Sequence, residues 1–217
     1  SMRYQPTPFQ SSIFAVGPTG VDSEFVGAEY DQLSAGAWAE YVPHWLGGHE
    51  AIFDALVDSI DWHAYRREMY DRVVDIPRLT GSSPRLGLAR EPLLDEMAET
   101  LSRRYRRDLT SVSFALYRDG RDSVAMHGDK MGRLRRDCVV AIVSVGAPRR
   151  FLLREVNGSG ARTYELGWGD LLVMGGDCQT TWRHGVPKAR HAEPRISIMF
   201  RQSLTALADL GSPARGR

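Results

Sequence analysis

The stretch Pro194-Arg-Ile-Ser-Ile-Met-Phe-Arg201 carries the pattern that decides the fold of this chain. Apolar residues occupy alternate positions, as in a β-strand, where successive side chains point to opposite faces. Arg195 and Arg201 are six residues apart and therefore share a face with Ser197 and Met199. If this face is buried, both guanidinium groups need an anion, because an unpaired charge away from water is unfavourable. If it is exposed, the segment is an edge strand with solvated arginines, and both interpretations stay open at this point.

Further short strands precede this one, each bounded by turn residues. They are rich in β-branched and aromatic residues and end near Gly, Pro, Asn or Asp. Closely spaced short strands of this kind predict a β-sandwich or a β-barrel, and we expect residues 111–203 to form it. The predicted strands cover 112–117, 139–145, 151–153 and 171–174.

The first 110 residues show a different pattern, which combines short strands with two helices. Apolar runs between Gly and Pro residues, such as 12–16 and 25–26, predict strands or hairpins. Apolar residues at helical spacing predict amphipathic helices over about 49–60 and 91–107. The segment 72–90 contains several prolines and glycines and is interpreted as an ordered surface loop. The predicted fold class is therefore mainly β, of the α+β type, with N-terminal strands and two flanking helices.

The composition is that of one globular domain spanning residues 1–217. Hydrophobic residues make up 42% and charged residues 25%, which excludes disordered, collagen-like and coiled-coil proteins. Residues 1–110 are expected to form an N-terminal extension to the β core, and residues 204–217 a flexible tail. No apolar run approaches the ~18 residues of a membrane span, and two cysteines do not make a disulfide framework. Because no signal-peptide pattern is present, we expect a cytoplasmic protein.

The net charge of +1 hides an uneven distribution of charged residues. Residues 1–60 hold one basic and eight acidic residues, whereas residues 61–217 hold 27 basic and 19 acidic residues. Of the 28 basic residues 26 are arginines, and guanidinium groups pair with carboxylate and phosphate through two parallel hydrogen bonds. The basic part of the chain is therefore compatible with an anionic partner, although solvated surface arginines explain the same count.

Three residues have the chemistry of metal ligands. His127-Gly128-Asp129 places an imidazole and a carboxylate two residues apart, and His184 follows near the far end of the β region. Two histidines and one carboxylate can occupy one face of an octahedral ion and leave three positions open, as in non-haem Fe(II) oxygenases. Each of these residues taken singly is more often a surface or hydrogen-bonded residue than a ligand. Their combination with the paired arginines makes the metal site the stronger hypothesis.

Four motifs follow one another in the C-terminal half of the chain. They are His127-Gly-Asp129, Gly169-Asp-Leu-Leu-Val-Met-Gly-Gly176, Gln179-Thr-Thr-Trp-Arg-His184-Gly-Val-Pro187 and Pro194-Arg-Ile-Ser-Ile-Met-Phe-Arg201. In this order they resemble the AlkB family of Fe(II)- and 2-oxoglutarate-dependent dioxygenases, and the resemblance spans roughly residues 75–202. It implies a double-stranded β-helix, or jelly-roll, core in which N-terminal elements form a nucleotide-recognition lid.

The resemblance implies a role for the motif residues. His127, Asp129 and His184 would hold Fe(II) and form the catalytic centre. The co-substrate 2-oxoglutarate and O2 would take the open positions of the ion, and Arg195 would pair with the distal carboxylate of 2-oxoglutarate. The residues implied to contact 2-oxoglutarate are Tyr117, Arg195, Ser197 and Arg201.

The residues on the substrate side are less closely specified. Pro77-Arg-Leu-Thr80 would line this side of the pocket. Trp62 and Tyr65 can equally pack beside the first helix, and Lys130 can be a solvated surface residue. The candidates for substrate contact are Trp62, Tyr65, Arg78, Met126, Lys130 and Trp182.

The activity implied by the resemblance is oxidative dealkylation of alkylated DNA or RNA bases, a repair reaction. The base would be flipped out of its strand into the pocket. Two alternatives are the same chemistry on a protein or small molecule, and a non-catalytic nucleic-acid-binding module, which would have no need of the metal ligands. Departures from the family pattern affect base recognition more than the iron site: Ala115 replaces an asparagine, Met131 an acidic residue, and Gly81-Ser-Ser-Pro84 aromatic residues.

Overall fold

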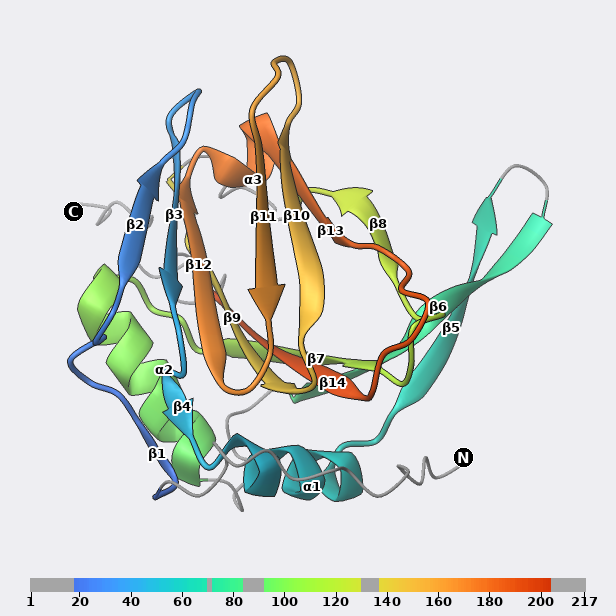
Figure 1. Cartoon of the computed structure of the whole chain (residues 1–217), viewed down its shortest axis with the longest axis horizontal. Helices are drawn as coiled ribbons and strands as arrows, with labels where there is room; N and C mark the ends of the chain where they lie inside the picture. Colours follow the sequence, from blue (N-terminus) through green and yellow to red (C-terminus); the bar gives the residue numbers. More distant parts are fainter. Residues whose placement is uncertain (1–17, 70–71, 84–91, 130–136, 204–217) are drawn as a thin grey trace, which may run out of the picture.

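The computed structural model describes residues 18–69, 72–83, 92–129 and 137–203, and antiparallel β-sheets dominate it (Figure 1). The larger sheet crosses the whole molecule. Its strands, in order across the sheet, are β2 (Glu29–Gln32), β3 (Ala37–Val42), β12 (Asp170–Gly176), β9 (Val140–Gly146), β14 (Arg195–Arg201), β7 (Ser111–Tyr117), β6 (Arg72–Ser83) and β5 (His63–Met69).

A smaller sheet faces part of the larger one. Apolar side chains of both sheets pack together to form one hydrophobic core. Two facing antiparallel sheets of this kind make the predicted jelly roll, and the predicted mainly β class is confirmed. The strands of the smaller sheet, in order, are β11 (Ala161–Leu166), β10 (Arg149–Glu155), β13 (Trp182–Val186) and β8 (Val124–His127), and a separate pair joins β1 (Gly20–Val21) to β4 (Leu46–Gly47).

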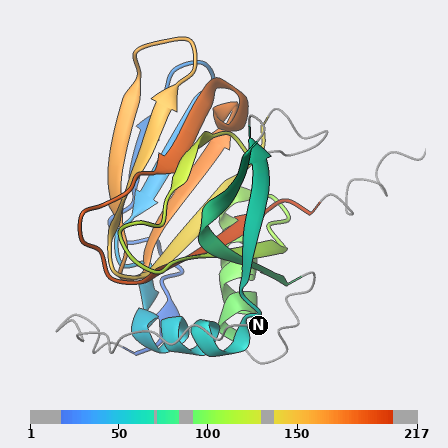
Figure 2. The same ribbon diagram turned by 90° about the vertical axis from the view of Figure 1, so that its right-hand side faces the viewer.

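The other face of the large sheet is covered by helices (Figures 1 and 2). The amphipathic helices α1 (His49–Ser59) and α2 (Pro92–Tyr105) confirm the two predicted helices within a few residues at each end. Their apolar stripes and the outer face of the sheet form a second hydrophobic core. Because both faces of β9 are covered, all seven of its residues are buried, which explains why apolar residues occupy successive positions and only Ser144 interrupts them.

β14 lies between β9 and β7 in the middle of the large sheet. The edge-strand interpretation of this segment is therefore wrong. Ile196, Ile198 and Phe200 pack in the helix-side core, so the alternating residues face the small sheet. Arg195 is completely buried on that side. Its guanidinium is therefore removed from water and requires an anion nearby.

The segment 72–90 was expected to be a surface loop, and for residues 72–83 this expectation is wrong. These residues form β6, which pairs with both β5 and β7. The prolines and glycines hide the strand pattern. Between Ala64 and Arg66 the partner of β5 moves from Leu79 to Asp75, so β6 contains a bulge that includes Pro77. A proline is tolerated there because a bulged residue need not donate a ladder hydrogen bond.

Other local expectations have mixed outcomes. Phe25, expected in a strand, lies in a turn with a left-handed φ of 54°. The segment 12–16 lies outside the described residues, as does the tail from 204 onwards. Short elements with weak patterns escaped sequence analysis, among them β8 and the four-residue helix α3 (Cys178–Thr181). Among the helices of the described part of the chain, none is both long and apolar enough to cross a membrane.

Candidate active site

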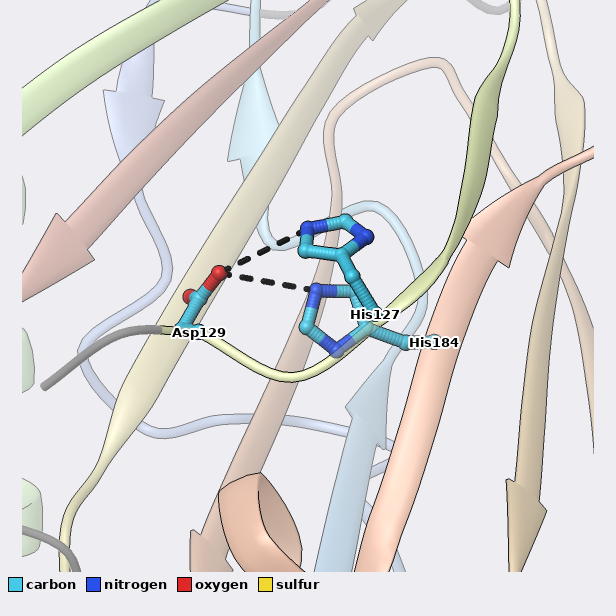
Figure 3. A group of neighbouring side chains, drawn as sticks. All are labelled: His127, Asp129 and His184. Atoms are coloured by element: carbon cyan, nitrogen blue, oxygen red, sulfur yellow. Dashed lines mark ion pairs between the residues drawn. The ribbon is translucent and has the colours of Figure 1, made fainter. Parts of the chain in front are cut away.

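The three predicted metal ligands lie together at one end of the small sheet (Figure 3). His127 is the last residue of β8, and it is directly opposite His184 on the neighbouring strand β13. Asp129 follows two residues after β8. Pairing of two strands far apart in the sequence therefore joins the His-x-Asp motif to the distant histidine, as the motif pattern predicted.

The geometry leaves one donor atom of each ligand facing the others. Oδ1 of Asp129 lies 3.7 Å from Nε2 of His127 and 3.7 Å from Nε2 of His184. Nδ1 of His127 is 2.8 Å from the carbonyl oxygen of Ala125. Because a carbonyl only accepts, Nδ1 carries the proton and Nε2 keeps a free lone pair. This backbone contact fixes the tautomer that a metal ligand requires.

The charges of the three groups also suit a divalent cation. Burial lowers the pKa of His184 to about 4, so its imidazole is neutral at pH 7. Burial alone would raise the pKa of Asp129, but the guanidinium of Arg201 and the two imidazoles outweigh it and hold that pKa below the usual value. Two imidazoles and one carboxylate form the two-histidine, one-carboxylate set that leaves open positions on Fe(II).

Arg201 anchors the carboxylate of Asp129. Its Nε donates a hydrogen bond to Oδ2 of Asp129 at 3.0 Å, and Nη1 donates to Oγ of Ser113 at 2.7 Å. Because Arg201 takes Oδ2, Oδ1 stays free to face the two imidazoles. Arg201, which the family resemblance placed among the co-substrate residues, is thus in direct contact with a candidate metal ligand.

A cavity of about 600 Å³ opens beside the ligands. Both sheets contribute to it, and β5 and β6 form its outer wall. A cavity of this size accommodates a small co-substrate together with part of a larger substrate. The residues around it are Asp61, His63, Tyr65, Arg78, Thr80, Gly81, Ser113, Phe114, Tyr117, Val124, His127, Asp129, Ile142, Phe151, His184, Val186, Ser197, Met199 and Arg201.

Arg195 is completely buried on β14, beside Tyr117 of the cavity lining. Its Nη2 donates to Oγ of Ser144 at 2.7 Å, whereas its Nε and Nη1 have no hydrogen-bond partner among the described residues. Burial lowers the pKa of Arg195 to about 10, so it is still protonated at neutral pH. A charged guanidinium with two unpaired donors fits a carboxylate, which would supply both the missing charge and the missing acceptors.

Tyr117 joins the buried arginine to the cavity. Its ring centroid lies 5.3 Å from the guanidinium carbon of Arg195 and 5.7 Å from that of Arg149. Its hydroxyl accepts a hydrogen bond from Nη1 of Arg78 at 3.3 Å. Ser197, on β14, is also buried and lines the cavity. Three of the four predicted co-substrate residues, Tyr117, Ser197 and Arg201, thus line the cavity together with the metal ligands, and the fourth, Arg195, contacts Tyr117.

The predicted substrate residues do not all lie at the cavity. Arg78 and Tyr65 line it. Trp182 is 2% exposed, and its indole N–H donates to the carbonyl of Ser34. Trp62 packs against the helix-side core and donates to the carbonyl of Val57. The residues that the cavity lining does not include are Trp62, Met126 and Trp182, and Lys130 lies outside the described residues.

Sequence reasoning missed several residues of the site. Ser113 shares a face of β7 with Tyr117, four residues away, and this even spacing was a signal that could have found it. Ser144 contacts Arg195 only because β9 pairs with β14, which no local pattern reveals. His63 on β5 and Asp61 just before it line the outer wall, and the pattern of this strand was too weak to predict.

Comparisons with known proteins agree with this geometry. A model described as the 2OG-Fe(II) oxygenase superfamily matches residues 53–202. Alpha-ketoglutarate-dependent dioxygenase alkB homolog 3 of Homo sapiens is 32% identical over 171 residues, which cover 69% of this chain and 60% of that protein. DNA oxidative demethylase ALKBH2 of Bos taurus is 28% identical over 139 residues, covering 56% of this chain and 50% of that protein. The solved structure of OsALKBH1 has a TM-score of 0.55 at 14% identity and covers 81% of this chain and 100% of its own, a likeness of fold. The chain thus spans 60% or less of the length of these two named relatives.

Proposed function

This chain belongs to the 2OG-Fe(II) oxygenase superfamily, and from that membership we propose that it oxidatively dealkylates alkylated bases in DNA or RNA. One observation carries the proposal: a two-histidine, one-carboxylate set lines the cavity, and a buried arginine with two unpaired donors lies directly behind it, against Tyr117 of the cavity lining. The similarity to alkB homolog 3 and to a DNA oxidative demethylase supports nucleic acid as the substrate class.

The residues present fit both Fe(II) and 2-oxoglutarate. His127, Asp129 and His184 would hold Fe(II), and bound Fe(II) supplies the activation of O2 that couples 2-oxoglutarate decarboxylation to oxidation of a C–H bond. Arg195 would bind the distal carboxylate of 2-oxoglutarate. This pairing satisfies Nε and Nη1, the two donors that lack partners among the described residues.

The side chains around these groups orient them and exclude water. The hydroxyl of Tyr117 would donate a hydrogen bond to the co-substrate, while its oxygen accepts a hydrogen bond from Arg78. Arg201 fixes one oxygen of Asp129 and leaves the other for the metal. The apolar side chains of Ile142, Phe151 and Val186 line the same cavity, which lowers the local polarity and strengthens the charged contacts.

Substrate would enter along the outer wall formed by β5 and β6. Tyr65, 53% exposed on this wall, offers a face on which a flipped base can stack. Asp61, His63 and Arg78 add polar groups that can hydrogen-bond to the edge of a base or to its backbone.

Reconstitution of the full chain tests this proposal. Fe(II) and 2-oxoglutarate are added to metal-free protein without oxygen, and O2 is then admitted with a panel of methylated DNA and RNA oligonucleotides. We expect formaldehyde and succinate in equal amounts with at least one oligonucleotide. Succinate formed only with a peptide or small molecule would contradict the proposed substrate class. No succinate with any substrate would contradict the proposed activity.

A further inference from the structure

The three candidate ligands come from two chain segments, and strand pairing aligns only two of them. β8 and β13 pair at His127 opposite His184 and at Val124 opposite Val186. Asp129 lies beyond the end of β8, so it takes no part in this ladder. Other contacts must therefore hold its carboxylate 3.7 Å from both imidazoles.

Gln179 on α3 supplies one of these contacts. Its side-chain oxygen Oε1 accepts a hydrogen bond from the backbone N–H of Asp129 at 2.9 Å. Because α3 leads directly into β13, this amide links the segment of Asp129 to the segment of His184. Arg201 binds the carboxylate itself, so the main chain and the side chain of Asp129 are held by two different residues.

The backbone before Asp129 packs directly on α3. A Cβ atom on Gly128 would lie 2.4 Å from the carbonyl oxygen of Gln179 and 3.8 Å from that of Trp182. Only glycine permits an approach this close to a carbonyl oxygen. The 127–129 segment and α3 therefore form one packed unit, and the bond from Asp129 to Gln179 lies within it.

The side chain of Gln179 is poorly suited to a purely space-filling role. It is 7% exposed, and its Nε2 has no hydrogen-bond partner among the described residues. A buried, unpaired amide donor costs about 1–3 kcal/mol, so packing alone would favour an apolar side chain here. We propose that Gln179 is a positioning residue that sets the Asp129 carboxylate relative to the two imidazoles of the metal site.

A pair of matched variants separates this role from a general contribution to stability. The inference rests on the metal site of the proposed function, so the test uses the metal-free full chain. Gln179→Met removes Oε1 and keeps the length of the side chain. Gln202→Met is the control, because Oε1 of Gln202 accepts from the backbone N–H of Val139 at the same distance of 2.9 Å, and that bond holds β9 rather than a ligand. Gln179→Glu keeps an acceptor at the original position.

Titration with Co(II), followed by its visible absorption, measures the site without requiring turnover. Loss of a group that orients a metal ligand weakens metal binding by roughly 10–100-fold, and we expect this for Gln179→Met together with an altered absorption spectrum. We expect the original affinity for Gln202→Met, substantial recovery for Gln179→Glu, and similar melting temperatures for the two Met variants.

Two outcomes would overturn the inference. One is equal Co(II) affinity in Gln179→Met and Gln202→Met. The other is a Gln179→Met protein that unfolds far below Gln202→Met, which would make Gln179 a residue of the fold. An unmodified chain that binds no Co(II) would instead overturn the metal site, and with it the proposed function.

Discussion

Two parts of the site are built in different ways: the inner end, which comprises the metal ligands and Arg195, and the outer wall formed by β5 and β6. At the inner end, Arg195 is fully buried on β14 and the side chain of Asp129, two residues after β8, is only 9% exposed, and each makes a specific hydrogen bond to a neighbouring side chain. On the outer wall, Tyr65 and His63 are more than half exposed. Nε2 of His63 lies 3.2 Å from Oδ2 of Asp61, and the rings of His63 and Tyr65 are 6.3 Å apart; contacts between such exposed side chains contribute little in water.

This difference suits the inner end to the chemical reaction and the outer wall to substrate recognition. Buried groups with fixed partners are preorganised, and the atoms that would bind Fe(II) and a carboxylate are already close to working positions. Exposed groups with weak partners can adapt to what binds. We therefore expect changes at the inner end to abolish the reaction, and changes on the outer wall to alter which substrate is used.

The largest effect is expected from His184→Ala. It removes one of three ligand atoms, so the loss in metal affinity should exceed the roughly 10–100-fold that follows loss of an orienting group. Co(II) titration and succinate release measure the two consequences. His191→Ala, at an exposed histidine seven residues away, should leave both unchanged. Turnover retained in His184→Ala would contradict the claim that the metal ligands at the inner end are essential for the reaction.

A large effect of a different kind is expected from Arg195→Met. Hydrogen bonds to charged groups are worth about 1.5–3 kcal/mol each, so loss of two should raise the KM for 2-oxoglutarate by roughly 100-fold or more. The protein without co-substrate should be as stable as the unmodified chain or more stable, because an unpaired buried charge is gone.

Steady-state kinetics and thermal unfolding of Arg195→Met measure these opposite changes. Exposed Arg154→Met serves as the control for the loss of a surface arginine. A marked fall in stability with an unchanged KM would show that Arg195 serves the fold and does not bind the co-substrate.

The inner end was also the part that sequence analysis predicted best. The spacing of His127-Gly-Asp129 and the six-residue separation of Arg195 from Arg201 are local patterns, and the β alternation shows that the arginines share a face. What the patterns could not show is pairing. Ser144 reaches Arg195, and Gln179 reaches Asp129, only because strands distant in the sequence are neighbours in space.

The outer wall was predicted poorly for physical reasons. β5 and β6 carry few regular apolar positions, since their cavity face is open and a bulge around Pro77 breaks the alternation. Trp62 and Trp182 are large and aromatic, so they were natural candidates for base stacking. Instead Trp182 is buried and Trp62 is partly buried against the helix-side core, and both donate their indole N–H to a backbone carbonyl, because packing a large aromatic side chain against the core stabilises the fold.

Tyr65→Ala tests the outer wall and should have an intermediate effect. Stacking of a base on an aromatic ring is worth about 1–3 kcal/mol, so the KM for a reactive oligonucleotide should rise by roughly 5–100-fold. The KM for 2-oxoglutarate should not change. Tyr30→Ala is the matched control, because Tyr30 is similarly exposed at 58% and lies on β2 at the opposite edge of the same sheet. Equal effects of the two variants would remove Tyr65 from the substrate site.

The smallest effect concerns a second buried histidine, His49 at the start of α1, which lies outside the cavity lining. Like His184 it is buried and its pKa is lowered by burial, although Glu50 and Asp170 partly oppose the shift. Neither ring nitrogen of His49 has a hydrogen-bond partner among the described residues. Because its folded pKa lies below the unfolded value of about 6.5, the unfolded chain binds more protons as the pH falls through 6.5. Stability is then lost until the pH falls below the folded pKa.

His49→Leu should therefore reduce the loss of unfolding free energy between pH 7 and pH 5 in the metal-free protein. Urea denaturation at the two pH values measures this, with the exposed His191→Leu as the control. His184 titrates in the same direction in every variant, so its contribution cancels in the difference between them. An unchanged pH dependence in His49→Leu would show that this buried imidazole makes no contribution to the acid sensitivity, and burial alone would then not give histidines inside and outside the site the same effect on stability.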